Sequence, residues 1–232
     1  MNIRLTIAAC CTAVGLAGCT NLPDAQDYST SLGASQQQMR EDPEWSAGRV
    51  WVRPGPALSS QYDKKLILEK VEYIQGDRPD DLKLSSDPAL RERALAYVNE
   101  ALRREFSQAG YRLLDTPAPR AMRVRAAITG TFRNDRDPRA MEYIPIGFLI
   151  GQGVKAAGFR DQSVRLLVEA TVRDAGSNEL LIASVGTVTG ANLPADREPT
   201  VDDMRSAVDE WARRVREQFE RIRQEGLPED AA

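Results

Sequence analysis

Catalytic side chains are scarce in this chain of 232 residues, which contains no histidine. Ser-His-Asp and Cys-His nucleophile systems, imidazole bases and His-ligated zinc are therefore excluded. Carboxylates remain for acid–base chemistry, and Glu69, Glu72 and Glu169 lie on predicted strands where any two could converge. A salt bridge or a strand-edge position explains Glu69 more simply. The sequence predicts a protein that is not an enzyme, with a carboxylate-based periplasmic hydrolase as the alternative.

One cysteine near the N-terminus has a spacing that indicates covalent modification. Arg4 precedes an apolar run over residues 5–17, which is typical of a secretory signal peptide and is too short to span a bilayer. The residues Leu16-Ala17-Gly18-Cys19 then resemble a bacterial lipobox. This resemblance implies a lipid on the sulfur of Cys19 and removal of residues 1–18. The alternative is a soluble periplasmic protein with an ordinary signal peptide.

The other two cysteines, Cys10 and Cys11, lie within the predicted signal peptide and would leave with it. The mature chain would then have no free thiol, which excludes disulfides, thiolate catalysis and iron–sulfur clusters. Thr20 and Asn21 follow the lipidated position, whereas an aspartate there tends to retain such lipoproteins at the inner membrane. We therefore predict a protein that is lipid-anchored to the outer membrane and faces the periplasm, with the inner membrane left open.

Arginines recur on the polar positions of two predicted strands. Residues two apart in a strand share a face, so one face would carry Arg123 and Arg125 from one strand and Arg165 and Arg173 from the other. Guanidinium groups bind phosphate and carboxylate groups through paired hydrogen bonds. These four arginines are a candidate surface for an anionic envelope component or a protein partner. A solvated face that pairs with Glu169 is the simpler interpretation.

An apolar segment at 143–159 is the second candidate contact region. Its glycines do not match a dinucleotide-binding or phosphate-binding loop. The segment could be a connection packed on the core, a contact surface for lipid or a partner, or part of a carrier for an apolar ligand. The candidate contact residues are Ile144, Ile146, Phe148, Leu149 and Ile150.

No cofactor is predicted from the sequence. The acidic clusters at 77–81 and 135–137 lack the spacing of a calcium-binding loop, so no metal is predicted either. The formal net charge of −3 gives no support for nucleic-acid binding. The oligomeric state is left open.

The elements that would position these residues follow from their periodicity. Helical spacing of apolar residues, bounded by capping residues, predicts long amphipathic helices over 87–110 and 200–226. Strands are expected at 50–52, 64–74, 111–114, 122–132, 162–174 and 179–190, the last two joined by a hairpin turn. The predicted fold is α+β, a two-layer sandwich of a mainly antiparallel sheet with both helices packed on one face.

These elements define the expected domain organisation. Residues 1–18 are a signal peptide, 19–48 a lipidated flexible tether, 49–226 a single α/β periplasmic domain, and 227–232 a disordered tail. The tether is expected because its sequence is polar and lacks a period.

Several segments occur along the chain in a distinctive order and spacing: Cys19, residues 58–65, 109–115 and 143–147, Val168-Glu169-Ala170 and Glu210-Trp211-Ala212. Together these segments resemble the DUF3313 family of uncharacterised bacterial lipoproteins. The resemblance spans nearly the whole mature chain and rests on the order and spacing of the segments rather than on one motif. It departs from the expected pattern at the hairpin turn, residues 174–178. It implies an envelope lipoprotein and supplies no catalytic residues, because none is established for the family.

Overall fold

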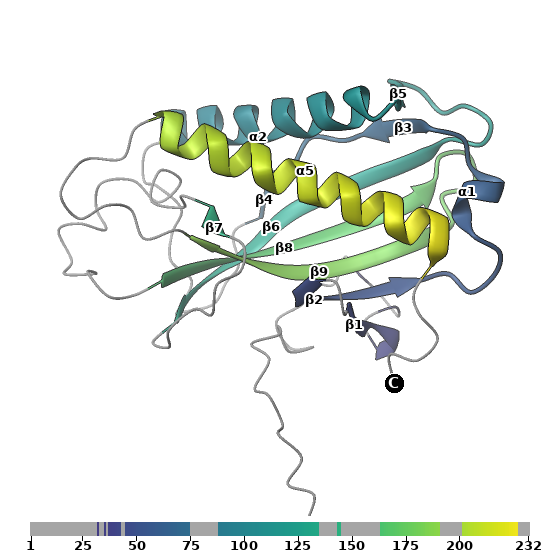
Figure 1. Ribbon diagram of the computed structural model, residues 1–232, viewed down its shortest axis with the longest axis horizontal. Coiled ribbons are helices and arrows are strands. Elements are labelled where there is room, and N and C mark those ends of the chain that lie inside the picture. Colours follow the sequence, from purple (N-terminus) through teal and green to yellow (C-terminus); the bar gives the residue numbers. More distant parts are fainter. Residues whose placement is uncertain are drawn as a thin grey trace, which may run out of the picture.

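Segments with alternating side chains form the strands of one nine-stranded sheet, and segments with helical periodicity form the helices (Figure 1). The computed structural model describes residues 32, 35, 37–42, 45–74, 88–134, 143–144, 163–190 and 201–226. The strands are β1 (Arg40–Asp42), β2 (Trp45–Val52), β3 (Lys65–Leu68), β4 (Glu72–Tyr73), β5 (Arg112–Leu113), β6 (Met122–Asn134), β7 (Tyr143–Ile144), β8 (Ser163–Asp174) and β9 (Leu180–Gly190). The helices are α1 (Leu58–Gln61), α2 (Pro88–Gln108) and α5 (Val201–Glu225).

The sheet is mostly antiparallel. The strand order along the sheet is β1-β2-β9-β8-β6-β3-β5. Each neighbouring pair among the first five strands of this order, β1, β2, β9, β8 and β6, is antiparallel. Parallel pairing is confined to β3 and β4 against β6, β3 against β5, and β7 against β9. The prediction of a mixed α/β chain with one mainly antiparallel sheet is confirmed.

The predicted strand at 64–74 is divided into β3 and β4 by a short break. Both parts pair with β6, and the break lies at residues 69–71. At this break the backbone N–H of Val71 donates a hydrogen bond to the side-chain oxygen Oδ1 of Asn99 on α2, at 2.7 Å, instead of to a neighbouring strand. This bond satisfies a backbone donor that the break would otherwise leave unpaired.

The turn between β8 and β9 is held by Asp174. Its carboxylate accepts hydrogen bonds from the N–H groups of Gly176 and Ser177, at 2.8 and 2.6 Å. The bond from Ser177 is the main reason that the pKa of Asp174 lies below its ordinary value. Asn178 then adopts φ +62°, a conformation that asparagine tolerates better than most residues. The unusual turn sequence thus forms a stable local structure.

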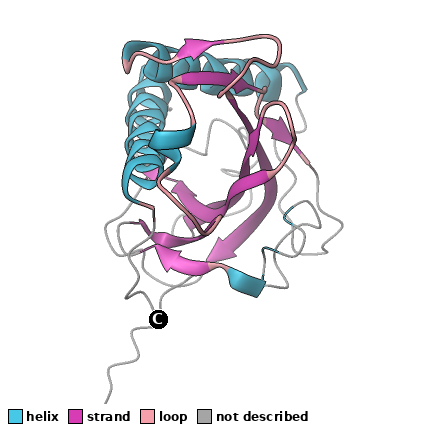
Figure 2. Ribbon diagram, turned by 90° about the vertical axis from the view of Figure 1, so that its right-hand side faces the viewer, coloured by secondary structure: helices cyan, strands magenta, loops and turns pink. Residues whose placement is uncertain are grey.

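The two long helices end as their sequences predict. Gly110 follows α2 with φ +84°, and Gly226 follows α5 with φ +74°. Left-handed backbone is favourable for glycine because it has no Cβ atom. Figures 1 and 2 show α2 and α5 side by side along the same side of the sheet. Among the described residues, no helix combines the length and the hydropathy needed to cross a bilayer.

The main core lies between these helices and the sheet. Its side chains come from α2, from α5 and from even-numbered positions in parts of β6 and β8, such as Met122, Ile128 and Val172. Phe106 of α2, Tyr111 and Phe219 of α5 form a cluster of edge-to-face rings, with centroids 5.3 to 5.9 Å apart. Burial raises the pKa of Tyr111 to about 12, because its charged form would lose hydration.

Strand structure begins at Arg40, not near Arg49 as the sequence predicts. The expected flexible tether of 19–48 therefore overlaps β1 and the start of β2. Leu32 and Met39, 2% and 8% exposed, pack with residues of β8 and β9 on the second face of the sheet. Sequence reasoning misses this region because β1 has only three residues, all charged, and the two apolar anchors have no regular period.

A buried carboxylate connects β1 to the C-terminal helix. Asp42 is 1% exposed, and both of its oxygens accept from the Arg221 guanidinium at 2.7 Å. The Gln218 amide donates to the same carboxylate at 2.7 Å. Residue 42 and residue 218 are 176 positions apart in the chain, so these contacts join two segments that are distant in the sequence.

An Asp42→Asn substitution is expected to lower the free energy of unfolding by about 1.5–3 kcal/mol, the range for hydrogen bonds to charged groups. The substitution keeps the side-chain volume but removes the charge that faces Arg221. Urea unfolding, followed by circular dichroism, would measure the change in midpoint. Asp63→Asn is the matched control, because Asp63 is partly exposed and forms ion pairs with Lys65 and Arg120 near the surface. Equal midpoints in the two variants would contradict a stabilising role for the Asp42 contacts.

Candidate functional site

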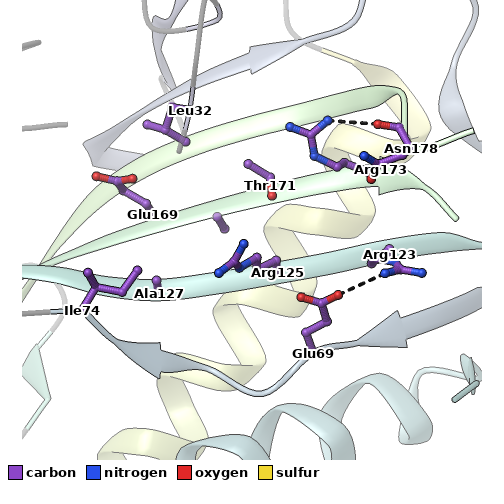
Figure 3. A pocket seen from close by; sticks show the side chains of 11 residues that line it. Leu32, Glu69, Ile74, Arg123, Arg125, Ala127, Glu169, Thr171, Arg173 and Asn178 are labelled. Carbon is purple, nitrogen blue, oxygen red and sulfur yellow. Dashed lines mark hydrogen bonds and ion pairs between the residues drawn. The ribbon is translucent and has the colours of Figure 1, made fainter. Parts of the chain in front are cut away.

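The face of the sheet away from α2 and α5 contains a depression of about 350 Å³ (Figure 3). Odd-numbered residues of β6 from Arg123 to Ala127 and of β8 from Glu169 to Arg173 line this face, whereas most of their even-numbered neighbours belong to the core beneath the helices. The lining residues are Leu32, Glu69, Ile74, Arg123, Arg125, Ala127, Glu169, Ala170, Thr171, Arg173 and Asn178.

Strand register places the arginines next to one another. In the antiparallel pair of β6 and β8, Arg123 lies opposite Arg173, and Arg125 lies opposite Thr171. Directly opposed side chains have Cβ atoms about 4.5–5.5 Å apart. Three guanidinium groups and one hydroxyl group therefore belong to two neighbouring cross-strand pairs on one face, and all four residues line the depression.

Each of these arginines has a different partner. Arg123 forms an ion pair with Glu69 at 3.4 Å, and Arg125 forms one with Glu72 at 3.3 Å. Arg173 donates to the backbone carbonyl of Asn178 at 2.9 Å. Within the described part of the chain, no carboxylate is paired with Arg173. The ion pairs are single contacts between partly exposed groups, so several guanidinium donors still face solvent.

Two carboxylates also line the depression, and both have partners. Glu69 accepts from Arg123, as described above. Glu169, only 2% exposed, accepts a hydrogen bond from the Thr129 hydroxyl at 3.0 Å. Thr129 lies at a β-bulge, where the register of β6 against β8 shifts between Ile128 and Gly130. In Figure 3, Arg125 lies between the two carboxylates.

The end of the depression away from Arg123 and Arg173 has apolar walls. Ile74, 41% exposed, lies next to Ala127, while Leu32 lies across β8 (Figure 3). Leu32 is held there by its packing with Leu167, Ala183 and Val185. The depression therefore has a cationic half and an apolar half.

The structure brings together three of the four predicted arginines. The backbone of Arg165 lies in β8, opposite Phe132, but its side chain lies outside the described residues. The backbone of Ile144 forms part of β7, which pairs with β9. The other candidate contact residues, Ile146, Phe148, Leu149 and Ile150, lie outside the described residues, as does Cys19.

Leu32, Ile74 and Asn178 are not among the site residues that the sequence predicts. Thr171 could have been found from its strand position, because it shares the odd parity of Arg165 and Arg173. No sequence signal indicates Leu32, since it reaches the site through a segment without periodicity. The described residues contain no group of three or more metal-binding side chains close enough to hold an ion.

Comparison with known proteins places this chain in a family. A family model described as "Protein of unknown function (DUF3313)" matches residues 27–215. The chain belongs to the DUF3313 family. The resemblance inferred from the sequence is thereby confirmed. The match includes α2, β6, β8 and β9, and so covers the strands that carry the arginines of this DUF3313 protein.

Two curated relatives of this DUF3313 protein have the same printed name, "Uncharacterized lipoprotein YdcL". They come from Escherichia coli strain K12 and from Escherichia coli O157:H7. Each is 23% identical over 209 residues, which cover 89% of this chain and 91% of the relative. The similarity therefore extends over nearly the full length of both proteins.

Solved structures of another protein show a weaker likeness. A PelC dodecamer from Paraburkholderia phytofirmans, carrying one point substitution, matches 72% of this DUF3313 chain and 93% of that chain, with 15% identity and a TM-score of 0.33. A second PelC dodecamer structure from the same organism covers 72% of this chain and 96% of that chain, with 14% identity and a TM-score of 0.29. These scores are too low to establish a shared fold.

Proposed function

We propose that this protein is a lipoprotein of the bacterial cell envelope, anchored through Cys19 to the outer membrane and facing the periplasm. Two independent observations support this proposal. The residues before Cys19 resemble a lipobox at the end of a signal peptide. The curated relatives, similar over 89% of the chain, are named as lipoproteins.

The proposed biochemical role is that of a non-enzymatic binding module. In this proposal, α2 and α5 cover one face of a two-layer sandwich and leave the second face for a ligand or a protein partner. The observation that carries it is the placement of Arg123, Arg125 and Arg173 around one depression on that second face. Such a surface would attract an anionic envelope component or an acidic patch on a partner protein.

Replacing Arg123 and Arg125 together with serine is expected to spare folding and to remove crosslinks formed through this face. Both side chains are partly exposed and make surface ion pairs, which contribute about 0–1 kcal/mol each. In-cell crosslinking with mass spectrometry would identify the partners, and urea unfolding would check the fold. Binding at this face should also weaken as salt rises, because exposed charges are screened.

The matched control is the double variant Arg213→Ser and Arg214→Ser. These arginines lie on α5 with similar exposure and pair with glutamates of the same helix. The control should keep every crosslink. If the Arg123 and Arg125 variant folds and keeps the same crosslinks as the wild type, the arginines are only a solvated surface.

A carboxylate-based hydrolase is the alternative function. The observation in its favour is that Glu69 and Glu169 line the same depression. Binding is the better supported function because each carboxylate already accepts a hydrogen bond within the protein, from Arg123 and Thr129 respectively. A general acid or base must instead be free to exchange a proton with the substrate.

A further inference from the structure

Resting on the proposed binding function, we propose that the depression binds an amphiphile with a phosphate monoester group, such as phosphatidic acid. The phosphate group would lie in the cationic half, between Arg123, Arg125 and Arg173. The apolar chain would lie in the other half, against Ile74 and Leu32.

The first observation that supports an anionic group on the ligand is the pair of opposed arginines. Arg123 and Arg173 are a directly opposed pair in an antiparallel ladder, where like charges destabilise the sheet. Thr171, opposite Arg125, completes the group of side chains with a neutral hydrogen-bond donor. An anion between the two strands would remove the repulsion between Arg123 and Arg173, so the pair favours ligand binding over a purely structural role.

The charges of this half match a phosphate group better than a carboxylate. Of the described residues that line the cationic half, Glu69 is the only carboxylate, and it contacts Arg123 through one nitrogen. Glu72 holds Arg125 from outside the depression. A planar carboxylate is bound fully by one guanidinium, whereas a phosphate monoester has three terminal oxygens and a charge of about −1.5 to −2 at pH 7. Donors from three separate side chains therefore suit phosphate.

The second observation, which supports an apolar chain on the ligand, is the apolar half of the depression. Ile74 is 41% exposed, whereas the other large apolar side chains of the described residues are buried or partly buried. Together with Ala127 and Leu32 it forms the end of the depression opposite Arg123 and Arg173 (Figure 3). Glu169 lies near this end but is only 2% exposed, so it presents little charged surface to a chain. An inorganic anion has no apolar part, so it would leave these apolar side chains exposed to water.

The size and position of the site fit a membrane lipid. A volume of about 350 Å³ is the space of about twelve water molecules, which is enough for a phosphate group and several methylene groups. Leu32, one wall of the site, follows Cys19 by 13 residues. A chain of that length spans at most about 45 Å, so the anchor would hold the site near lipid phosphates.

Binding of short-chain lipids to the full-length lipoprotein would test this proposal. Isothermal titration calorimetry in a neutral detergent, with binding to empty micelles subtracted, would compare three probes. Dihexanoyl phosphatidic acid should bind at least about tenfold more tightly than dihexanoyl phosphatidylcholine or inorganic phosphate, because only it combines a dianionic phosphate group with acyl chains. Phosphatidylcholine has the same acyl chains but a zwitterionic phosphodiester in place of the dianionic group, and inorganic phosphate has no acyl chains.

Two single variants would test the cationic half and the apolar half of the depression separately. Arg173→Gln should weaken binding of phosphatidic acid by about tenfold or more, since it removes charge-assisted hydrogen bonds. Ile74→Ser should weaken binding of phosphatidic acid and leave binding of inorganic phosphate unchanged. Arg213→Gln, on the outer surface of α5, is the matched control and should bind all probes as the wild type does.

The outcomes separate this proposal from the broader one. Equal affinity for inorganic phosphate and phosphatidic acid, or equal effects of Arg173→Gln and Arg213→Gln, would overturn the amphiphile site. If no probe binds but the Arg123 and Arg125 double variant loses its crosslinks, the ligand is a protein and only the lipid proposal fails. If no probe binds and the crosslinks also persist, both proposals fail.

Discussion

Replacing Cys19 with serine is expected to move the protein out of the lipid-anchored membrane fraction. The proposed anchor depends on a thiol, because the lipid is joined through the sulfur atom, and serine has none. Each buried methylene group of a lipid contributes about 0.8 kcal/mol to membrane affinity, so the loss of several acyl chains would have a large effect. Cell fractionation, together with metabolic labelling by palmitate, would measure the change.

Cys11→Ser is the matched control for this variant. Cys11 lies in the same N-terminal segment but eight residues before the predicted lipidation site. The control should therefore be processed, labelled and anchored like the wild type. A Cys19→Ser protein that is still fully processed and membrane-bound would contradict the lipoprotein proposal and would favour another mode of attachment.

Replacing Phe106 with alanine is expected to destabilise the domain by about 3–5 kcal/mol, the usual range for removing a large buried aromatic side chain. Phe106 is 1% exposed, and its ring makes edge-to-face contacts with Tyr111 and Phe219. The substitution would leave a cavity between α2 and α5. Because a domain is typically stable by only about 5–15 kcal/mol, the variant would lose a large part of its stability.

Urea unfolding of the Phe106→Ala protein would measure this loss as a lower midpoint with an unchanged slope. Phe106→Leu is the matched variant, because leucine fills most of the space but cannot make edge-to-face ring contacts, which contribute about 0.5–1.5 kcal/mol per pair. Its midpoint should lie between those of the alanine variant and the wild type. Equal midpoints for Phe106→Ala and the wild type would contradict the assignment of this cluster to the core.

Local periodicity was sufficient to predict the longest elements. The alternation at 122–132 predicted β6, and helical spacing between capping residues predicted α2 and α5. Parity also placed Arg123 and Arg125 on one face, because residues two apart in a strand share a face. The structure has both residues lining the same depression.

Short and irregular segments could not be predicted in the same way. β1 has three charged residues, so nothing in its sequence distinguishes it from a tether. The burial of Asp42 depends on Arg221 and Gln218, which are supplied by a helix at the other end of the chain. A charged residue is expected to be exposed unless such a partner is present, and one segment alone does not show its partner.

Residue types and spacings within single segments were enough to establish three properties: the type of each long element, the exclusion of histidine chemistry, and the candidate lipidation site at Cys19. The composition of the depression required the folded chain. Only there does Arg123 lie opposite Arg173, and only there do Leu32 and Ile74 form the apolar end of the same depression. The reason is that strand register and the docking of distant segments depend on packing across the whole core, whereas parity is a property of each strand alone.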